Sequence, residues 1–158
     1  MSDTAVVITV STRATAGVYV DRSGPVVVEA LGELGFLVAE PVLVPDGEAV
    51  GTALRAAVAD EHAVVITTGG TGLSPDDQTP EQTRSVLERE VPQLAAAIAR
   101  YGVEHGVPTA ALSRGIAGVA GRTVIVNLPG SSGGARDGMA VLAPVLEHAV
   151  SQVRGGDH

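Results

Sequence analysis

The segment with the clearest chemical potential is a glycine- and threonine-rich stretch that directly follows an apolar run. Residues 67–72 read Thr-Thr-Gly-Gly-Thr-Gly. Glycine lets the backbone turn tightly and approach an anion closely, and successive N–H groups beside hydroxyls can form a concave anion site. An ordinary strand-to-loop connection is the alternative, but fewer glycines would serve it. The stretch is neither G-x-G-x-x-G nor Walker A, and its predicted phosphate-binding residues are Thr68, Gly69, Gly70, Thr71 and Gly72.

Acidic residues are placed where they can face that stretch. Asp76 and Asp77 follow it closely, and Asp46 lies in the turn Pro45-Asp46-Gly47 after an earlier apolar run. A carboxylate beside an anion site repels the anion, and a bound Mg²⁺ removes this conflict by bridging carboxylate and phosphate oxygens. The spacing fits equally well with acids that only precede a helix, whose N-terminal dipole favours negative charge. Asp46 alone is an ordinary turn residue; it counts because it ends a strand at the same predicted edge.

Two further polar clusters follow apolar runs later in the chain. Asn127-Leu128-Pro129-Gly130-Ser131 is a strand end that leads into a turn and a helix. It can wrap a nucleotide, or it can simply cap the helix with Ser132 or a neighbouring serine. Ser113-Arg114 also follows a candidate strand, and Arg114 can hold a phosphate, although a surface arginine is the commoner outcome. Ligands bind at the carboxyl ends of strands in open α/β sheets, so all these segments are expected at one edge.

Composition restricts the remaining chemistry. All ten cationic side chains are arginine and the net charge is −8, which excludes Schiff-base and P-loop lysines. The diffuse basic patch that nucleic acid requires is also missing, so we expect no nucleic-acid partner. No cysteine is present, which removes disulfides and thiolate chemistry. A phosphorylated small molecule, held by backbone N–H groups, a few arginines and a divalent cation, remains compatible with this composition.

The elements that must position these residues alternate between strand and helix. Apolar, β-branched runs predict strands, and helical periodicity bounded by proline and glycine predicts helices between them. The predicted strands are Ala5–Val10, Phe36–Leu43, Ala63–Thr67, Thr109–Ser113 and Arg122–Asn127. The predicted helices are Val26–Leu34, Glu48–Glu61, a stretch opened by a capping box at Thr79-Pro80-Glu81-Gln82 that resumes through Leu94–Tyr101, and Ala135–Val153.

This alternation predicts right-handed βαβ units and a parallel or mixed sheet sandwiched by helices. Aromatic residues make up only 2% of the chain, so Val, Ala and Leu must build the core. We expect one domain over residues 1–158, with a frayed tail at 155–158. The apolar run Ala5–Val10 is too short for a signal peptide or a membrane span, so we expect a cytoplasmic protein without a membrane partner.

Taken together and in order, these segments resemble the molybdopterin adenylyltransferase family, the Mog/MoaB-like group of molybdenum-cofactor biosynthesis proteins. The resemblance runs from about Val6 to about Val150. Each matching segment is weak alone, and the ordered set is specific. The segments are Val10–Arg13, Asp21–Pro25, Val44–Asp46, Thr67–Gly72, Asp77–Glu81, Leu112–Arg114 and Asn127–Ser131.

The resemblance implies a three-layer α/β/α sandwich with a mostly parallel, mixed sheet of about five strands. It also implies homotrimers, which in some members assemble into hexamers. The implied activity is Mg²⁺-dependent adenylylation of molybdopterin with ATP, which gives adenylyl-molybdopterin and pyrophosphate. The product would then pass to a separate enzyme that inserts molybdate.

Site residues are carried over from the family position by position. Asp46 and Asp77 match two aspartates considered essential, and we expect them to hold the metal rather than act as bases. The remaining matches are Gly69, Gly70, Thr71 and Gly72 in the phosphate loop, Ser113 and Arg114 near the pterin pocket, and Asn127, Pro129, Gly130 and Ser131 along the same cleft. The chain departs from the family at Ser132, where proline is frequent, and at Gly47, where many relatives carry a second acid.

Two other functions stay open at this point. The same domain type occurs in molybdate-insertion proteins, which are usually much longer than 158 residues. A non-catalytic molybdopterin carrier is the second alternative. The presence of both Asp46 and Asp77 argues against the carrier, because binding alone would not need two acids near anions.

Overall fold

The structure is a computed structural model, and it describes residues 3–156. One mixed sheet of seven strands runs through it in the order β2-β1-β4-β7-β6-β5, with β3 also paired to β1. The pairs among β1, β2, β3, β4 and β7 are parallel, whereas β6 runs antiparallel to both β7 and β5. The strands are β1 Thr4–Val10, β2 Leu37–Val38, β3 Val42–Val44, β4 Val64–Thr68, β5 Arg89–Glu90, β6 Ala117–Ala120 and β7 Thr123–Leu128.

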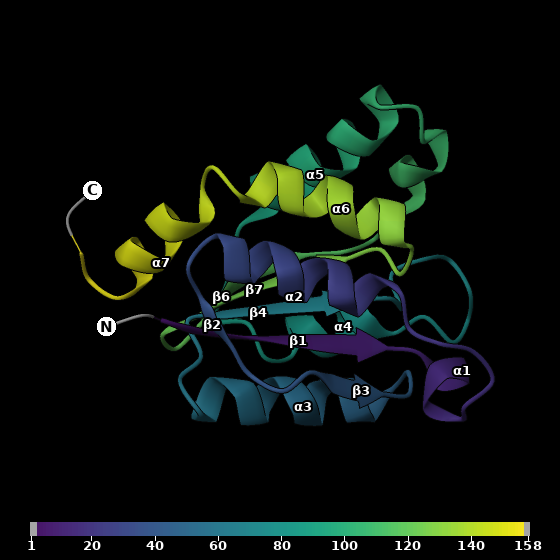
Figure 1. Cartoon of the computed structure of the whole chain (residues 1–158), viewed down its shortest axis with the longest axis horizontal. Coiled ribbons are helices and arrows are strands. Elements are labelled where there is room, and N and C mark those ends of the chain that lie inside the picture. The colour runs from purple at the N-terminus through teal and green to yellow at the C-terminus, as the bar shows by residue number, and fades with distance from the viewer. Residues whose placement is uncertain (1–2, 157–158) are drawn as a thin grey trace.

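Helices cover both faces of this sheet, so the predicted three-layer α/β/α fold is confirmed (Figure 1). Helices α2, α5, α6 and α7 lie on one face, and α3 lies on the other with α4 packed beside it. The helices are α1 Thr12–Thr15, α2 Ser23–Glu33, α3 Glu48–Ala59, α4 Thr79–Arg84, α5 Pro92–Glu104, α6 Ser132–Leu142 and α7 Leu146–Val153, with a 3₁₀ helix η1 at Pro108–Leu112. Within the described residues, none of these helices is long and apolar enough to cross a membrane.

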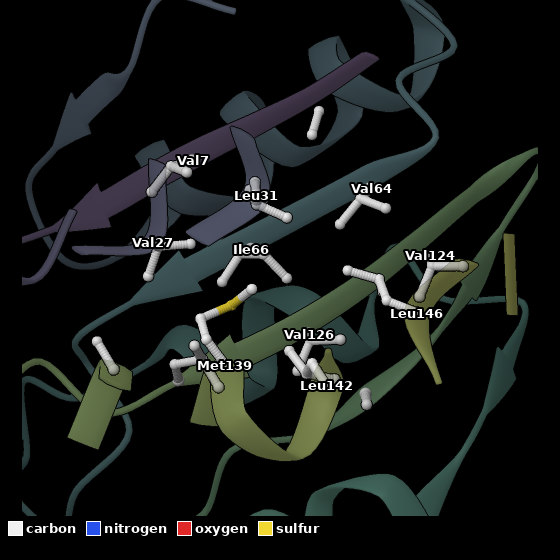
Figure 2. Close-up of a cluster of buried hydrophobic side chains, with 14 of the residues drawn as sticks. Val7, Val27, Leu31, Val64, Ile66, Val124, Val126, Met139, Leu142 and Leu146 are labelled. Atoms are coloured by element: carbon white, nitrogen blue, oxygen red, sulfur yellow. The ribbon is translucent and has the colours of Figure 1, made fainter. Parts of the chain in front are cut away.

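The two faces of the sheet carry separate apolar cores. Successive side chains of a strand point to opposite faces, so Val7 joins the cluster under α2 and α6 while Val6 and Ile8 join the one under α3. Figure 2 shows the first cluster, where side chains from the helices interdigitate with those of the central strands. Its fully buried members include Val27, Leu31, Ile66, Val126 and Leu142.

Proline divides two elements that the sequence pattern predicts as continuous. The predicted strand Phe36–Leu43 forms β2 and β3, which both pair with β1 on either side of Pro41. The predicted helix Ala135–Val153 begins earlier, at Ser132, and is split into α6 and α7 around Pro144. In both places proline cannot donate the backbone hydrogen bond that a continuous element needs.

Three other predictions of secondary structure are wrong or incomplete. Thr109–Ser113 is not a strand: after Pro108 the backbone closes local bonds, with Ser113 N donating to Ala110 O at 3.2 Å. Within the described residues the sheet has seven strands rather than about five, because the predicted strand at 36–43 forms two strands and the short strands β5 and β6 have no alternating apolar pattern that would predict them. The capping box is absent, since Gln78 rather than Thr79 is the N-cap of α4 and makes no side-chain cap bond.

The chain end is described up to residue 156. Gly155 N and Gly156 N donate to carbonyls of α7, at 3.0 and 2.7 Å. The remainder of the predicted frayed tail, residues 157–158, lies outside the described residues.

Candidate functional site

The glycine-rich loop leaves the carboxyl end of β4 in a left-handed turn. Gly69 and Gly70 have φ of +94° and +69°, where a side chain would be strained. A β-carbon at position 69 would also overlap the carbonyl oxygen of Val10 at the end of β1. The loop stays in register with β7, because Gly69 N donates to Leu128 O at 3.0 Å. Neighbouring strands therefore hold the loop at the edge where ligands bind in such sheets.

Both predicted aspartates lie against this loop. Asp46 Oδ1 accepts hydrogen bonds from Gln78 N at 2.9 Å and Gly47 N at 3.0 Å. Its Oδ2 lies 2.8 Å from the point that a β-carbon of Gly70 would occupy. Asp77 Oδ2 accepts from Ser74 N at 3.1 Å and lies 2.8 Å from the corresponding point at Gly72. Two carboxylates from separate loops therefore flank one glycine-rich turn.

The segment after β7 meets the same loop. A β-carbon on Gly130 would lie 3.1 Å from the α-carbon of Gly69, so the two glycine turns pack closely. Ser131 Oγ accepts from Gly134 N at 3.0 Å and is the N-cap of α6. Capping, one of the two roles open for this segment, is therefore present, and it fixes the N-terminus of α6 beside the turn.

Asn127 is almost fully buried and bonds within the chain. Its Oδ1 accepts from Ile116 N at 3.1 Å, and its Nδ2 donates to the hydroxyls of Thr67 at 2.9 Å and Thr83 at 3.0 Å. The side chain thus ties β4, β7 and α4 together at the edge of the sheet. A direct contact between Asn127 and a ligand stays a prediction.

A cavity of about 670 Å³ opens beside the two glycine turns. Its polar wall comes from the loops after β4 and β7 and from Ser113, and its apolar wall comes from α5 and η1. No arginine or histidine is among its lining residues within residues 3–156; the two charged ones are Asp77 and Asp137. The lining residues of the apolar wall are Ala95, Ile98, Ala99, Gly102, Val107, Ala110 and Leu112. Asp46 does not line the cavity, but its Oδ2 lies next to Gly70, and Gly70 does line it.

Arg114 braces the loop from outside the cavity lining. Its Nε donates to Gly72 O at 2.8 Å, and its Nη2 donates to Asp77 O at 2.8 Å. Its Nη1 lies 2.6 Å from Glu81 Oε2, and this bond holds the pKa of the Glu81 carboxyl below its ordinary value. One guanidinium therefore joins the glycine loop, the Asp77 turn and α4. The expected contact between Arg114 and a phosphate stays a prediction.

Comparison with known proteins identifies the family to which this arrangement belongs. The family described as "Probable molybdopterin binding domain" matches residues 6–148 of the chain. The chain belongs to that family.

The relatives of this molybdopterin-binding-domain chain agree with the assignment. The curated molybdopterin adenylyltransferase of Helicobacter pylori (strain J99) is 33% identical over 153 residues, which cover 94% of this chain and 86% of that protein. The Mog protein from Mycobacterium ulcerans, described as a molybdopterin biosynthesis protein, has a solved structure that matches with a TM-score of 0.92 at 52% identity. That match covers 96% of this chain and 99% of the other.

Some relatives are much longer than this chain. The molybdenum cofactor synthesis protein cinnamon of Drosophila melanogaster is 40% identical over 134 residues, which cover 82% of this chain and 22% of that protein. The chain spans less than half the length of the first curated relatives it matches.

Negative charge gathers around Asp46, although Arg114 lies close to Asp77. Burial raises the pKa of the Asp46 carboxyl above its ordinary value, and the bonds from Gln78 N and Gly47 N oppose that rise. The negative charges of Asp77 and Asp76 raise this pKa further. A site with this much negative charge favours either protonation or a bound cation.

The donor set at this place fits a divalent cation. Within residues 3–156 no group of three or more His, Cys, Asp or Glu side chains could hold a metal, but Mg²⁺ usually takes one or two carboxylates together with substrate phosphates. Asp46 and Asp77 supply two carboxylates, and the buried hydroxyl of Thr79 nearby has no hydrogen-bond partner among the described residues. These are hard oxygen ligands, which Mg²⁺ prefers.

Several residues of this site were missed by sequence reasoning or assigned a different role. The sequence predicts that Thr68 binds phosphate, but its side chain is fully buried, outside the cavity lining, and accepts a hydrogen bond from Ser23 Oγ at 2.9 Å. Asp21 accepts bonds from Ser23 N, Gly24 N and Thr9 Oγ1, and so fixes the start of α2 beneath the loop. The apolar wall from α5 and η1 was not predicted, because small apolar residues are typical of any packed helix.

Proposed function

We propose that this chain transfers the adenylyl group of ATP to the terminal phosphate of molybdopterin and releases pyrophosphate. The observation that supports the proposal most directly is the pair Asp46 and Asp77, which flank a glycine turn that lines a cavity of about 670 Å³. The family membership and the Helicobacter pylori relative support the same reaction.

The reaction needs positioning and charge neutralisation more than acid–base chemistry. A phosphate oxygen of molybdopterin attacks the α-phosphorus of ATP, a new P–O bond forms, and the bond to the β-phosphate oxygen breaks. Pyrophosphate leaves with the electron pair of that bond. The attacking phosphate is already ionised at neutral pH, so no general base is required.

The chain contributes binding and orientation to this step. Backbone N–H groups of the glycine turn and the N-terminus of α6 would hold phosphate oxygens, since both present partial positive charge. The apolar wall of α5 and η1 would hold a flat ring. Asp46 and Asp77 would hold Mg²⁺, which supplies neutralisation of the negative charge of the two reacting phosphates.

Other properties of the proposal come from the family resemblance. They are a homotrimer or a hexamer built from it, a cytoplasmic location, and transfer of the product to an enzyme that inserts molybdate. Size-exclusion chromatography with light scattering tests the oligomeric state independently of activity.

The deciding experiment is one assay with purified protein, molybdopterin, ATP and Mg²⁺. Pyrophosphate release and the adenylylated pterin are followed together, and each reaction is repeated with EDTA. We expect stoichiometric amounts of both products that depend on Mg²⁺. Tight pterin binding without product would contradict the proposal and favour the carrier function. Consumption of adenylyl-molybdopterin in the presence of molybdate would favour the insertion function.

A further inference from the structure

Thr79 carries a buried hydroxyl that the proposed reaction has not yet used. It is the first residue of α4, its side chain is fully buried, and its backbone N–H donates to Gly70 O at 3.1 Å. Its Oγ1 has no hydrogen-bond partner among residues 3–156. Burial of an unpaired hydroxyl costs free energy. The presence of a hydroxyl at this position therefore needs an explanation.

The other fully buried threonines differ from Thr79 in this respect. Within residues 3–156, four others share its complete burial, and each of their hydroxyls has a partner within the chain. These bonds are Thr67 with Asn127 at 2.9 Å, Thr68 with Ser23 at 2.9 Å, Thr83 with Asn127 at 3.0 Å, and Thr123 with His62 O at 2.6 Å. Among the fully buried threonines of residues 3–156, Thr79 is therefore the exception, because its hydroxyl has no hydrogen-bond partner.

The location of this hydroxyl relates it to Asp46. A β-carbon at Gly70 would overlap Thr79 Oγ1 and would lie 2.8 Å from Asp46 Oδ2. The hydroxyl and the carboxylate oxygen therefore border the same point beside Gly70, yet they are not hydrogen-bonded to each other. Helix capping does not explain the hydroxyl either, because the N-cap of α4 is Gln78.

We propose that Thr79 Oγ1 is the third protein oxygen of the cation site formed by Asp46 and Asp77, binding either the divalent ion or one of its waters. Mg²⁺ commonly keeps several waters and accepts hydroxyl oxygens as ligands. A neutral hydroxyl adds a ligand without adding negative charge beside two carboxylates and the incoming phosphates. The inference rests on the proposed function in that both need a cation at these aspartates.

Gly70 lies next to the hydroxyl, since a β-carbon at this position would overlap Thr79 Oγ1, and we expect this residue to move when the ion binds. Its φ of +69° and the absence of a side chain make it the most adaptable position next to Thr79. The same movement would give the Thr79 hydroxyl a partner, which it lacks among residues 3–156. The proposal thus links a local conformational change to metal binding.

The test compares Thr79→Val with wild type, because valine keeps the shape and removes the hydroxyl. Mn²⁺ is titrated in the presence and absence of ATP and followed by electron paramagnetic resonance. Chemical unfolding is measured in EDTA. We expect the Mn²⁺ dissociation constant to rise by about tenfold or more, while the metal-free protein is as stable as wild type or more so, because an unpaired group has been removed. Thr79→Ser should restore affinity.

Thr83→Val is the matched control on the same helix. Thr83 is equally buried, but its hydroxyl accepts a bond from Asn127. This variant should be less stable than wild type in EDTA and should bind Mn²⁺ with unchanged affinity. A Thr79→Val variant with wild-type Mn²⁺ affinity, or with a loss of metal-free stability like that of Thr83→Val, would overturn the inference.

The outcomes also separate this inference from the proposed function. Wild type that binds Mn²⁺ tenfold more tightly than Thr79→Val but makes no adenylylated pterin supports the cation site and contradicts the reaction. An active wild type with equal Mn²⁺ affinity in both proteins contradicts only the role of Thr79. Wild type that binds no Mn²⁺, even with ATP, contradicts both.

Discussion

At the scale of single residues, Asp46 and Asp77 differ in their surroundings although both face the glycine loop. Asp46 accepts two backbone N–H bonds and has a raised pKa because of burial and neighbouring negative charge. Asp77 accepts one N–H bond from an exposed residue, Ser74. Substitution of Asp77 should therefore disturb the fold less than substitution of Asp46.

The first prediction concerns Asp77→Asn. Asparagine keeps an acceptor oxygen for Ser74 N, so the thermal unfolding midpoint should remain near that of wild type. Turnover should fall on the order of 100-fold, because one charged group that organises the reacting phosphates is lost. Steady-state pyrophosphate release at saturating Mg²⁺ measures the effect. Asp76→Asn, at an exposed neighbouring position, is the control, and near-normal rates in Asp77→Asn would refute the metal-holding role.

The second prediction concerns Gly70→Ala. A left-handed residue other than glycine costs about 1–2 kcal/mol, and the new β-carbon would overlap Thr79 Oγ1. We expect lower stability and loss of measurable ATP binding by calorimetry. Gly32→Ala is the control, because Gly32 is an exposed helical glycine with open space around it. That change should raise stability by up to about 1 kcal/mol, and unaltered ATP binding in Gly70→Ala would contradict the loop assignment.

At the scale of elements, Arg114 connects three segments that the chain brings to one place. Its bonds to Gly72 O and Asp77 O hold two loops, and its ion pair with Glu81 holds α4. Lysine carries the same charge but lacks the planar fork that reaches several acceptors at once. These side-chain bonds add to the backbone bond between Thr79 N and Gly70 O, which also joins α4 to the glycine loop.

The third prediction follows from the Glu81 carboxyl, whose pKa Arg114 lowers. A folded-state pKa below the unfolded one stabilises the protein above the unfolded value, about 4.3 for glutamate, and this contribution is lost as pH falls through the folded-state pKa. Glu81→Gln should therefore unfold at a slightly lower temperature than wild type at pH 7, because the pair is exposed. The difference should close on acidification below about pH 4. A constant difference across this range would show that the ion pair does not contribute.

At the scale of the whole molecule, the sheet separates two cores and exposes the site at its carboxyl edge. The larger core lies under α2, α6 and α7, on the face of the sheet opposite α3. Its packing sets the global stability, whereas the loops at the edge set ligand binding. These two properties should respond independently to mutation when the sites are distant.

The fourth prediction tests that independence with Leu142→Ala. Leu142 is fully buried between α6 and the sheet (Figure 2), and its truncation should lower the free energy of unfolding by about 2–5 kcal/mol. Mn²⁺ affinity should stay at the wild-type value at temperatures where the variant is folded. Leu37→Ala is the control, since Leu37 is 59% exposed and should change stability by about 0.5 kcal/mol or less. Altered Mn²⁺ affinity in folded Leu142→Ala would show that core and site are coupled.

Local sequence pattern determined the central part of this molecule. Strands β1, β4 and β7 are buried on both faces, so their sequences are continuous apolar runs. Such runs can be recognised without knowing which strands pair with them. The glycine turn after β4 and the turn at Asp46 were predictable for a similar reason, because their backbone demands particular residue types within a few positions. The prolines at 41 and 144 carried the signal for the breaks that the pattern reading missed.

Only the tertiary structure decided which side chains meet. The strand β6 has no alternating pattern, and its Gly118 is explained by the close approach of the Arg89 carbonyl, which is distant in sequence. The side-chain partners of Arg114 lie 33 to 42 residues away in the sequence. The apolar residues of α5 and η1 look like those of any packed helix, and only the folded structure shows that they line the cavity together with the loops. The missing partner of Thr79 likewise cannot be read from a sequence, because an unpaired hydroxyl is defined by everything around it. Local propensity depends on a few neighbouring residues, whereas the site depends on contacts between residues distant in sequence, which form only when the chain folds.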